Sequence, residues 1–74
     1  VQNNVSRFIA EGGDVFAVHI VKAANEIRPK DEVVVIDEDG KVLAVGRAVL
    51  SGEEMKAFKT GVAIKVRRGS REES

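Results

Sequence analysis

The sequence predicts a mainly β domain with two short helices, folded as a small pseudo-barrel of mostly antiparallel strands. Three strand-like runs, separated by turns and one short helix, occupy residues 32–36, 41–50 and 62–68. The pair Asp39-Gly40, among the strongest short hairpin signals, joins the first two runs. No segment between the runs is long enough for the crossover helix that a parallel sheet requires. A bent antiparallel sheet that closes on itself therefore accounts for these pieces.

A short helix is predicted over residues 4–11. Its apolar residues recur at the spacing of one helical face, and they are Val5, Phe8 and Ile9. The pair Gly12-Gly13 then ends the helix, because glycine adopts the left-handed C-cap conformation without steric cost.

A strand is predicted next, over residues 15–23, where β-branched and aromatic residues predominate. Both of its alternating faces are apolar, so we expect it to be covered on both sides. The following loop, at 24–31, contains Arg28-Pro29, and a proline favours an extended or turn conformation for the residue before it.

The run at 32–36 is apolar after its first residue, as in a central strand. A hairpin turn at 37–40 leads to the return strand at 41–50. Gly46 lies inside that strand, where glycine usually marks a bulge or a tight bend.

The second helix carries its own start and stop signals. Ser51 and Glu54 have the spacing of a capping box, and Gly61 is predicted to end the helix. The last strand, 62–68, alternates between apolar and other residues, and we expect residues 70–74 to form a frayed polar tail.

Length and composition indicate one domain of 74 residues. The chain has no cysteine, as is common in a reducing compartment, and we expect a cytoplasmic protein. No run of about 20 apolar residues is present that could span a membrane. Because the chain begins with Val1 rather than Met, we expect a domain excised from, or C-terminal to, a larger protein.

The charged residues are segregated along the chain although the net charge is zero. Between Met55 and Arg71 every charged residue is basic, whereas between Asp31 and Asp39 every charged residue is acidic. A fold that keeps these segments apart has a basic margin on its last strand, which favours a polyanion such as nucleic acid as a partner.

Four ordered segments resemble the PUA domain, a compact RNA-binding pseudo-barrel appended to RNA-modifying enzymes; they are 8–13, 27–36, 43–50 and 61–69. The resemblance is closest to the C-terminal PUA domain of archaeosine tRNA-guanine transglycosylases. Two departures from the family pattern occur. The turn Pro29-Lys30-Asp31 has lysine where glycine is common, and only residues 1–3 are available for the strand that usually precedes the first helix.

The resemblance implies an RNA site on the first helix, the glycine loop, the adjoining strand and the end of the last strand. Carried over to this chain, the site comprises Arg7, Gly12, Gly13, Asp14, Val15, Phe16, Lys65, Arg67 and Arg68. The resemblance also implies a non-catalytic module that grips the acceptor stem of tRNA. A separate catalytic domain, in a transglycosylase or another RNA-modifying parent protein, would perform the chemistry.

The residues offer a physical basis for such a site, and each has a plainer alternative. Backbone amides at the diglycine can approach a phosphate closely, or the pair can simply cap the helix. Arg67 and Arg68 can bind phosphate bidentately, or they can form an ordinary solvated strand edge. All three phenylalanines are assigned to the core, and Phe16 is also considered for stacking on a base. Arg47 is expected to pair with an acid of the 37–39 turn.

No catalytic, metal-binding or cofactor-binding residues are predicted. The chain has a single histidine and no cysteine, so no nucleophile–base pair or metal cluster can be assembled. The alternative to RNA binding is a protein-interaction or assembly domain that packs against a catalytic partner domain. The apolar faces of the strand predicted at 15–23 favour that alternative.

Overall fold

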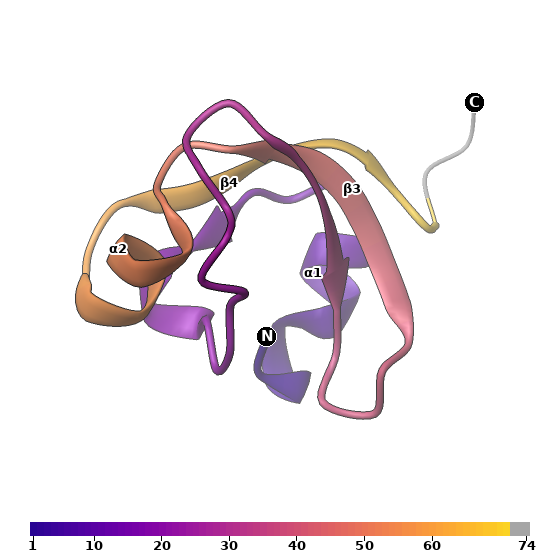
Figure 1. Cartoon of the computed structure of the whole chain (residues 1–74). Helices are drawn as coiled ribbons and strands as arrows, with labels where there is room; N and C mark the ends of the chain where they lie inside the picture. The colour runs from indigo at the N-terminus through magenta and orange to yellow at the C-terminus, as the bar shows by residue number, and fades with distance from the viewer. Residues whose placement is uncertain (72–74) are drawn as a thin grey trace.

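The computed structural model describes residues 1–71 and places a curved antiparallel sheet over α1 (Figure 1). Within the described residues the sheet has four strands in the order β1-β4-β3-β2. The elements in chain order are a 3-10 turn at Asn3–Val5, α1 at Ser6–Ala10, β1 at Val15–Phe16, a 3-10 turn at Ala17–His19, β2 at Glu32–Ile36, β3 at Val42–Ala48, α2 at Gly52–Ala57 and β4 at Val62–Gly69. The predicted fold class is confirmed. Among the described residues no helix is long and apolar enough to cross a membrane.

The first two residues join the two edges of the sheet. The α-amine of Val1 donates a hydrogen bond to the carbonyl oxygen of Ile36 at the end of β2, at 2.9 Å. The amide of Gln2 donates to the carbonyl oxygen of His19, just beyond β1, at 3.0 Å. These two bonds satisfy one backbone carbonyl at the end of β2 and one in the turn after β1, so the first residues of the chain bridge these two segments.

In the 74-residue chain by itself, burial of the Val1 α-amine makes the stability depend on pH. Desolvation lowers the pKa of the amine, and the nearby Glu38 and Asp37 carboxylates only partly oppose it. The folded state therefore binds this proton less tightly than the unfolded state, so stability rises with pH up to about 8, the ordinary pKa of an α-amine. Acetylation removes the charge and keeps an N–H donor for Ile36.

We therefore expect the acetylated chain to melt at a higher temperature than the free chain at pH 6, with the difference closing by pH 9. Thermal melts of the two forms at both pH values measure this, and the other titrating groups cancel in the comparison. An equal difference at both pH values would contradict the role assigned to the amine.

Small aliphatic side chains fill the interior. The largest side chains that are fully buried are Ile9, Met55 and Val15, and five alanines share the core with them. All three phenylalanines are instead exposed, Phe8 by 57%, Phe16 by 41% and Phe58 by 46% of their surface, so their assignment to the core was wrong. A domain of this size encloses little volume, and close-packed aliphatic residues occupy it without room for rings.

The strand predicted over 15–23 was also wrong beyond its second residue. Phe16 pairs with Val62, the first residue of β4, so no strand lies opposite the residues that follow. The chain turns instead: the amide of Ala17 donates to the carbonyl oxygen of Gly61 and that of Ile20 to Ala17. Strand propensity is overridden here because a strand needs a neighbour for its backbone groups.

The hairpin and the bulge follow the prediction. Gly40 has a φ of +84°, and the Asp37 carboxylate accepts hydrogen bonds from two amides of the turn. The ladder between β3 and β4 shifts register between Val45 and Gly46. A Cβ atom at Gly46 would lie 2.5 Å from the carbonyl oxygen of Lys65, so only glycine permits this close approach.

The predicted capping box of α2 is confirmed, with reciprocal hydrogen bonds between Ser51 and Glu54. The helix nevertheless ends at Ala57, before Gly61, whose φ of +87° belongs to the turn that leads into β4. The first two residues of the predicted frayed tail are hydrogen-bonded to the domain. The amide of Ser70 donates to the carbonyl oxygen of Leu43 and that of Arg71 to the carbonyl oxygen of Ala10, both at 2.7 Å. The rest of that predicted tail, 72–74, lies outside the described residues.

Candidate nucleic-acid interface

The diglycine follows Glu11, the C-cap residue of α1, and ends the helix. Gly12 has a φ of +104°, its amide donates to Ile9 at 2.9 Å, and the amide of Gly13 donates to Phe8 at 2.9 Å. Both amides are engaged inside the protein, so they do not form the phosphate cradle considered from the sequence. A contribution of these glycines to binding must come from the close approach that they allow.

The end of β4 lies directly against this bend. A Cβ atom at Gly69 would be 2.2 Å from the carbonyl oxygen of Ala10 and 2.7 Å from the amide nitrogen of Gly12. Because Arg68 precedes Gly69, the backbone of Arg68 lies next to this bend. The backbones of residues far apart in the sequence thus meet at this bend.

Asp14 and Val15 serve mainly the fold. The Asp14 carboxylate accepts a hydrogen bond from the amide of Val66 at 2.9 Å and so joins the bend to the middle of β4. The side chain of Val15 is fully buried and cannot reach a ligand from the surface. Phe16 is exposed, and the edge of its ring meets the His19 ring with 6.4 Å between centroids.

Phe8 is a surface residue that the sequence analysis missed. It lies over Gly13 so closely that a Cβ atom there would be 2.1 Å from its ring. A signal for this was available, because neighbouring helical residues point about 100° apart and a helix this short has one buried face. Ile9 occupies that face with 1% exposure, so Phe8 is left outside, beside the diglycine bend.

Two of the predicted cations are paired with carboxylates. Arg7 pairs with Glu11, the residue just past the end of α1, at 3.2 Å, and Arg67 pairs with Glu32. Arg47 lies 3.9 Å from the same Glu32 carboxylate, so its expected pairing with the 37–39 turn was wrong. The cause is the register of the hairpin, which places Glu32 opposite Arg47. All these pairs are exposed, and such pairs contribute little to stability.

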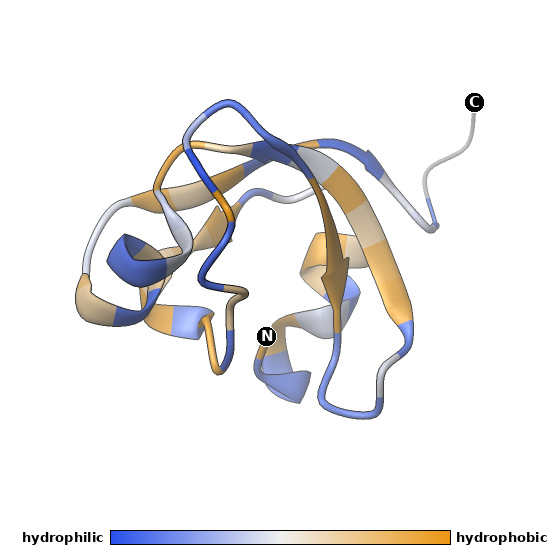
Figure 2. Ribbon diagram, in the orientation of Figure 1, coloured by the Kyte–Doolittle hydropathy of each residue, from blue (hydrophilic) through white to orange (hydrophobic). Residues whose placement is uncertain are grey.

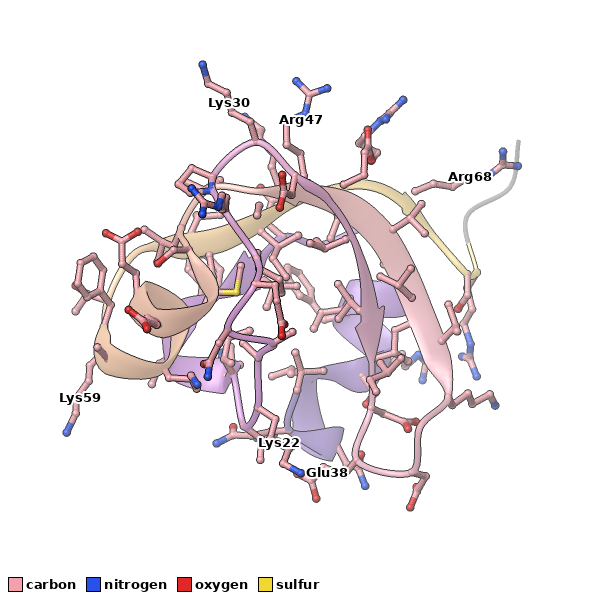
Figure 3. All side chains as sticks on the ribbon, in the orientation of Figure 1. Lys22, Lys30, Glu38, Arg47, Lys59 and Arg68 are labelled. Atoms are coloured by element: carbon pink, nitrogen blue, oxygen red, sulfur yellow. The ribbon has the colours of Figure 1, made fainter. Side chains whose placement is uncertain are left out.

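The remaining predicted cations, Lys65 and Arg68, have no ion pair with any residue that the structure describes, and they occupy different surroundings. Lys65 lines a shallow hollow with Arg47 and Arg67. Arg68 lines a separate hollow with Val45 and Gly69, nearer the diglycine bend. Figure 3 shows Arg47 and Arg68 projecting from different parts of the surface. The basic margin predicted from the sequence is therefore divided into two groups.

An apolar patch borders these cations on the outer face of β2 and β3. Val34 faces Val45 and Ile36 faces Val42 across the two strands, and all four side chains are exposed. Figure 2 shows the apolar character of both strands. Within residues 1–71, no group of three or more histidine, aspartate or glutamate side chains could hold a metal ion.

Comparison with known proteins identifies a family and two relatives that the chain resembles. A family model described as the PUA domain matches residues 1–70. The tRNA-guanine(15) transglycosylase of Thermococcus kodakarensis is 45% identical over 69 residues, which are 93% of this chain and 12% of the relative. The archaeosine synthase subunit alpha of the same organism is 59% identical over 56 residues, or 76% of this chain and 10% of the relative. The chain thus spans about one-eighth or less of these proteins.

The fold also matches a solved structure closely. A conserved PUA domain protein from Thermoplasma acidophilum superposes with a TM-score of 0.91 at 32% sequence identity. The match covers 99% of this chain and 48% of the solved chain.

Proposed function

The chain belongs to the PUA domain family, and on that premise we propose that it is a non-catalytic RNA-binding module that grips the acceptor end of tRNA. PUA domains are RNA-binding modules. One sequence relative is named as a tRNA-guanine(15) transglycosylase, which favours tRNA as the ligand. A catalytic domain elsewhere in the parent protein would act on the tRNA that this module holds.

The observation that carries the proposal is the meeting of the diglycine bend with the end of β4. The exposed Phe8 ring lies on Gly13, and Arg68, which has no ion pair among the described residues, precedes Gly69 at the end of β4 and lines the hollow beside Val45. Aromatic rings stack on unpaired bases with about 1–3 kcal/mol each, and arginine binds phosphate bidentately. The 3′ end of tRNA offers both partners together, because its last bases are unpaired and its backbone is charged.

The test is the affinity of the 74-residue chain for an unmodified tRNA transcript at low and at moderate salt. We expect binding that weakens by about one log unit per tenfold increase in salt for each phosphate contact. A transcript without its unpaired 3′ nucleotides is the matched RNA control and should bind more weakly. Absence of binding at low salt would overturn the proposal and leave the apolar outer patch as support for an assembly domain.

Removal of two arginines from β4 is expected to weaken this binding without unfolding the chain. Arg67→Ala with Arg68→Ala should reduce the salt dependence by about two contacts, because each residue can neutralise one phosphate. The melting temperature should change little, since the Glu32 pair that is lost is exposed. Lys22→Ala with Lys59→Ala carries the same change of charge on other parts of the surface (Figure 3) and serves as the control. Equal affinities for the two variants would remove Arg67 and Arg68 from the site.

A further inference from the structure

We propose that the outer face of the sheet carries a second phosphate-binding track, formed by Lys30, Arg47 and Lys65. It takes a stretch of RNA backbone beyond the one held at the diglycine bend. The inference rests on the proposed function and adds to it an extended path for the ligand.

The three cations line one depression. Arg47 on β3 and Lys65 on β4 are direct cross-strand partners. Two hollows share both residues. Lys30 also lines one of them, and Arg67 also lines the other. Figure 3 shows Lys30 and Arg47 projecting together from the same side of the molecule.

The backbone at Lys30 is in a conformation that lysine rarely adopts. Its φ is +77°, and among the described residues every other positive φ belongs to a glycine. The amide of Lys30 donates to the carbonyl oxygen of Ala48 at 2.7 Å, and the amide of Ala48 donates to Asp31 at 2.8 Å. These bonds fix the turn to the end of β3 and so fix the direction in which the Lys30 side chain leaves the backbone. A side chain at a strained position that glycine would relieve is better explained by binding than by stability.

The charges of the depression favour an anion. Glu32 is the acid that pairs here, and it pairs with Arg67 and, at 3.9 Å, with Arg47. The Asp31 carboxylate accepts a hydrogen bond from the amide of Arg28 and forms no ion pair with Lys30 among the described residues. Four cations, Lys30, Arg47, Lys65 and Arg67, and two carboxylates, Asp31 and Glu32, leave a net charge of +2 around this depression, which a bound polyanion would offset.

Continuity along β4 favours RNA over an acidic peptide. Lys65 and Arg67 of the depression and Arg68 near the diglycine bend lie within four consecutive residues of one strand. A single sugar-phosphate chain can therefore pass from the bend onto the outer face. RNA carries a negative charge at every nucleotide and so can contact both groups of cations, whereas a short acidic peptide could be held by one group alone.

The experiment compares a double variant, which carries both Lys30→Gln and Arg47→Gln, with the wild-type chain. Glutamine removes each charge and keeps much of the aliphatic stem. The probes are a hairpin with the tRNA acceptor stem and its 3′ end, and the same hairpin with the stem lengthened by one helical turn. We expect the variant to bind the long hairpin about tenfold more weakly, with a salt dependence reduced by about two contacts, and to bind the short hairpin unchanged. Glu32→Gln should act in the opposite direction and strengthen binding of the long hairpin.

The controls separate this inference from the proposed function. A double variant with Lys22→Gln and Lys59→Gln removes the same charge from other parts of the surface. A second test variant, with Lys30→Gly and Arg47→Gln, removes the strain at the turn and serves if the first test variant does not fold. Equal binding of the long hairpin by test and control variants would overturn the track while RNA binding itself stands. Wild-type chain that binds neither hairpin would overturn the proposed function and the track with it. A poly-glutamate peptide that binds through Lys30 and Arg47, with RNA affinity unaffected by their loss, would also overturn the track.

Discussion

Gly69→Ala is expected to lower the free energy of unfolding by about 3 kcal/mol, through overpacking that cannot relax. The new Cβ atom would lie 2.2 Å from the carbonyl oxygen of Ala10 and 2.7 Å from the nitrogen of Gly12. Both are backbone atoms, so no change of side-chain rotamer relieves the contact, and β4 must separate from the end of α1. A chain of 74 residues has a total stability of roughly 4–11 kcal/mol. The substitution therefore removes a large fraction of it.

Urea denaturation followed by circular dichroism measures this loss, and Gly40→Ala is the matched control. Gly40 also has a positive φ, of +84°, but a Cβ atom there would meet nothing within 4 Å. Its replacement should cost only the strain of the left-handed conformation, about 1–2 kcal/mol. A loss at Gly69 no greater than the loss at Gly40 would show that the close approach of β4 to α1 is not needed.

The parts of the fold that the sequence predicted well depend on local chemistry. The Asp39-Gly40 turn, the bulge at Gly46 and the cap made by Ser51 are each determined by a few neighbouring residues. The segment after Phe16 was mispredicted because its structure depends on a distant residue. β4 starts at Val62, so a segment rich in β-branched residues has no strand to pair with.

The candidate site was predicted less completely, because register and bulges group its side chains. Lys65, Arg67 and Arg68 form one basic run in the sequence. In the structure Lys65 and Arg67 line one hollow and Arg68 lines another, and the ladder between β3 and β4 shifts register at this place, between Val45 and Gly46. The pairing of Glu32 with Arg47 likewise follows from hairpin register, whereas Arg67 reaches the same carboxylate from β4 on the other side of β3. That register includes an irregularity between Val35 and Ile36, which no pattern in the residues marks.

Gly13→Ala is expected to reduce RNA affinity about tenfold while leaving the fold nearly as stable, the opposite outcome to Gly69→Ala. The Cβ atom added at Gly13 would lie 2.1 Å from Cε2 of Phe8, which is an atom of an exposed ring rather than of the backbone. The φ of Gly13 is not positive, so alanine fits the backbone there. The ring can swing away from the bend at little cost in stability. In doing so it leaves the position from which it would stack on a base, an interaction of about 1–3 kcal/mol.

A double-mutant cycle with Phe8→Ala tests whether the two residues act as one unit. Each single variant should weaken binding of the tRNA transcript to a similar extent, and the double variant should bind no more weakly than Phe8→Ala alone. Losses that add would mean that Gly13 contributes by itself, through close approach of its backbone to the RNA. Wild-type affinity in Gly13→Ala would instead show that the position of the Phe8 ring on the bend has no part in binding. The cycle is informative because Phe8 is largely exposed, so its removal should leave the core, and with it the geometry of β4, unchanged.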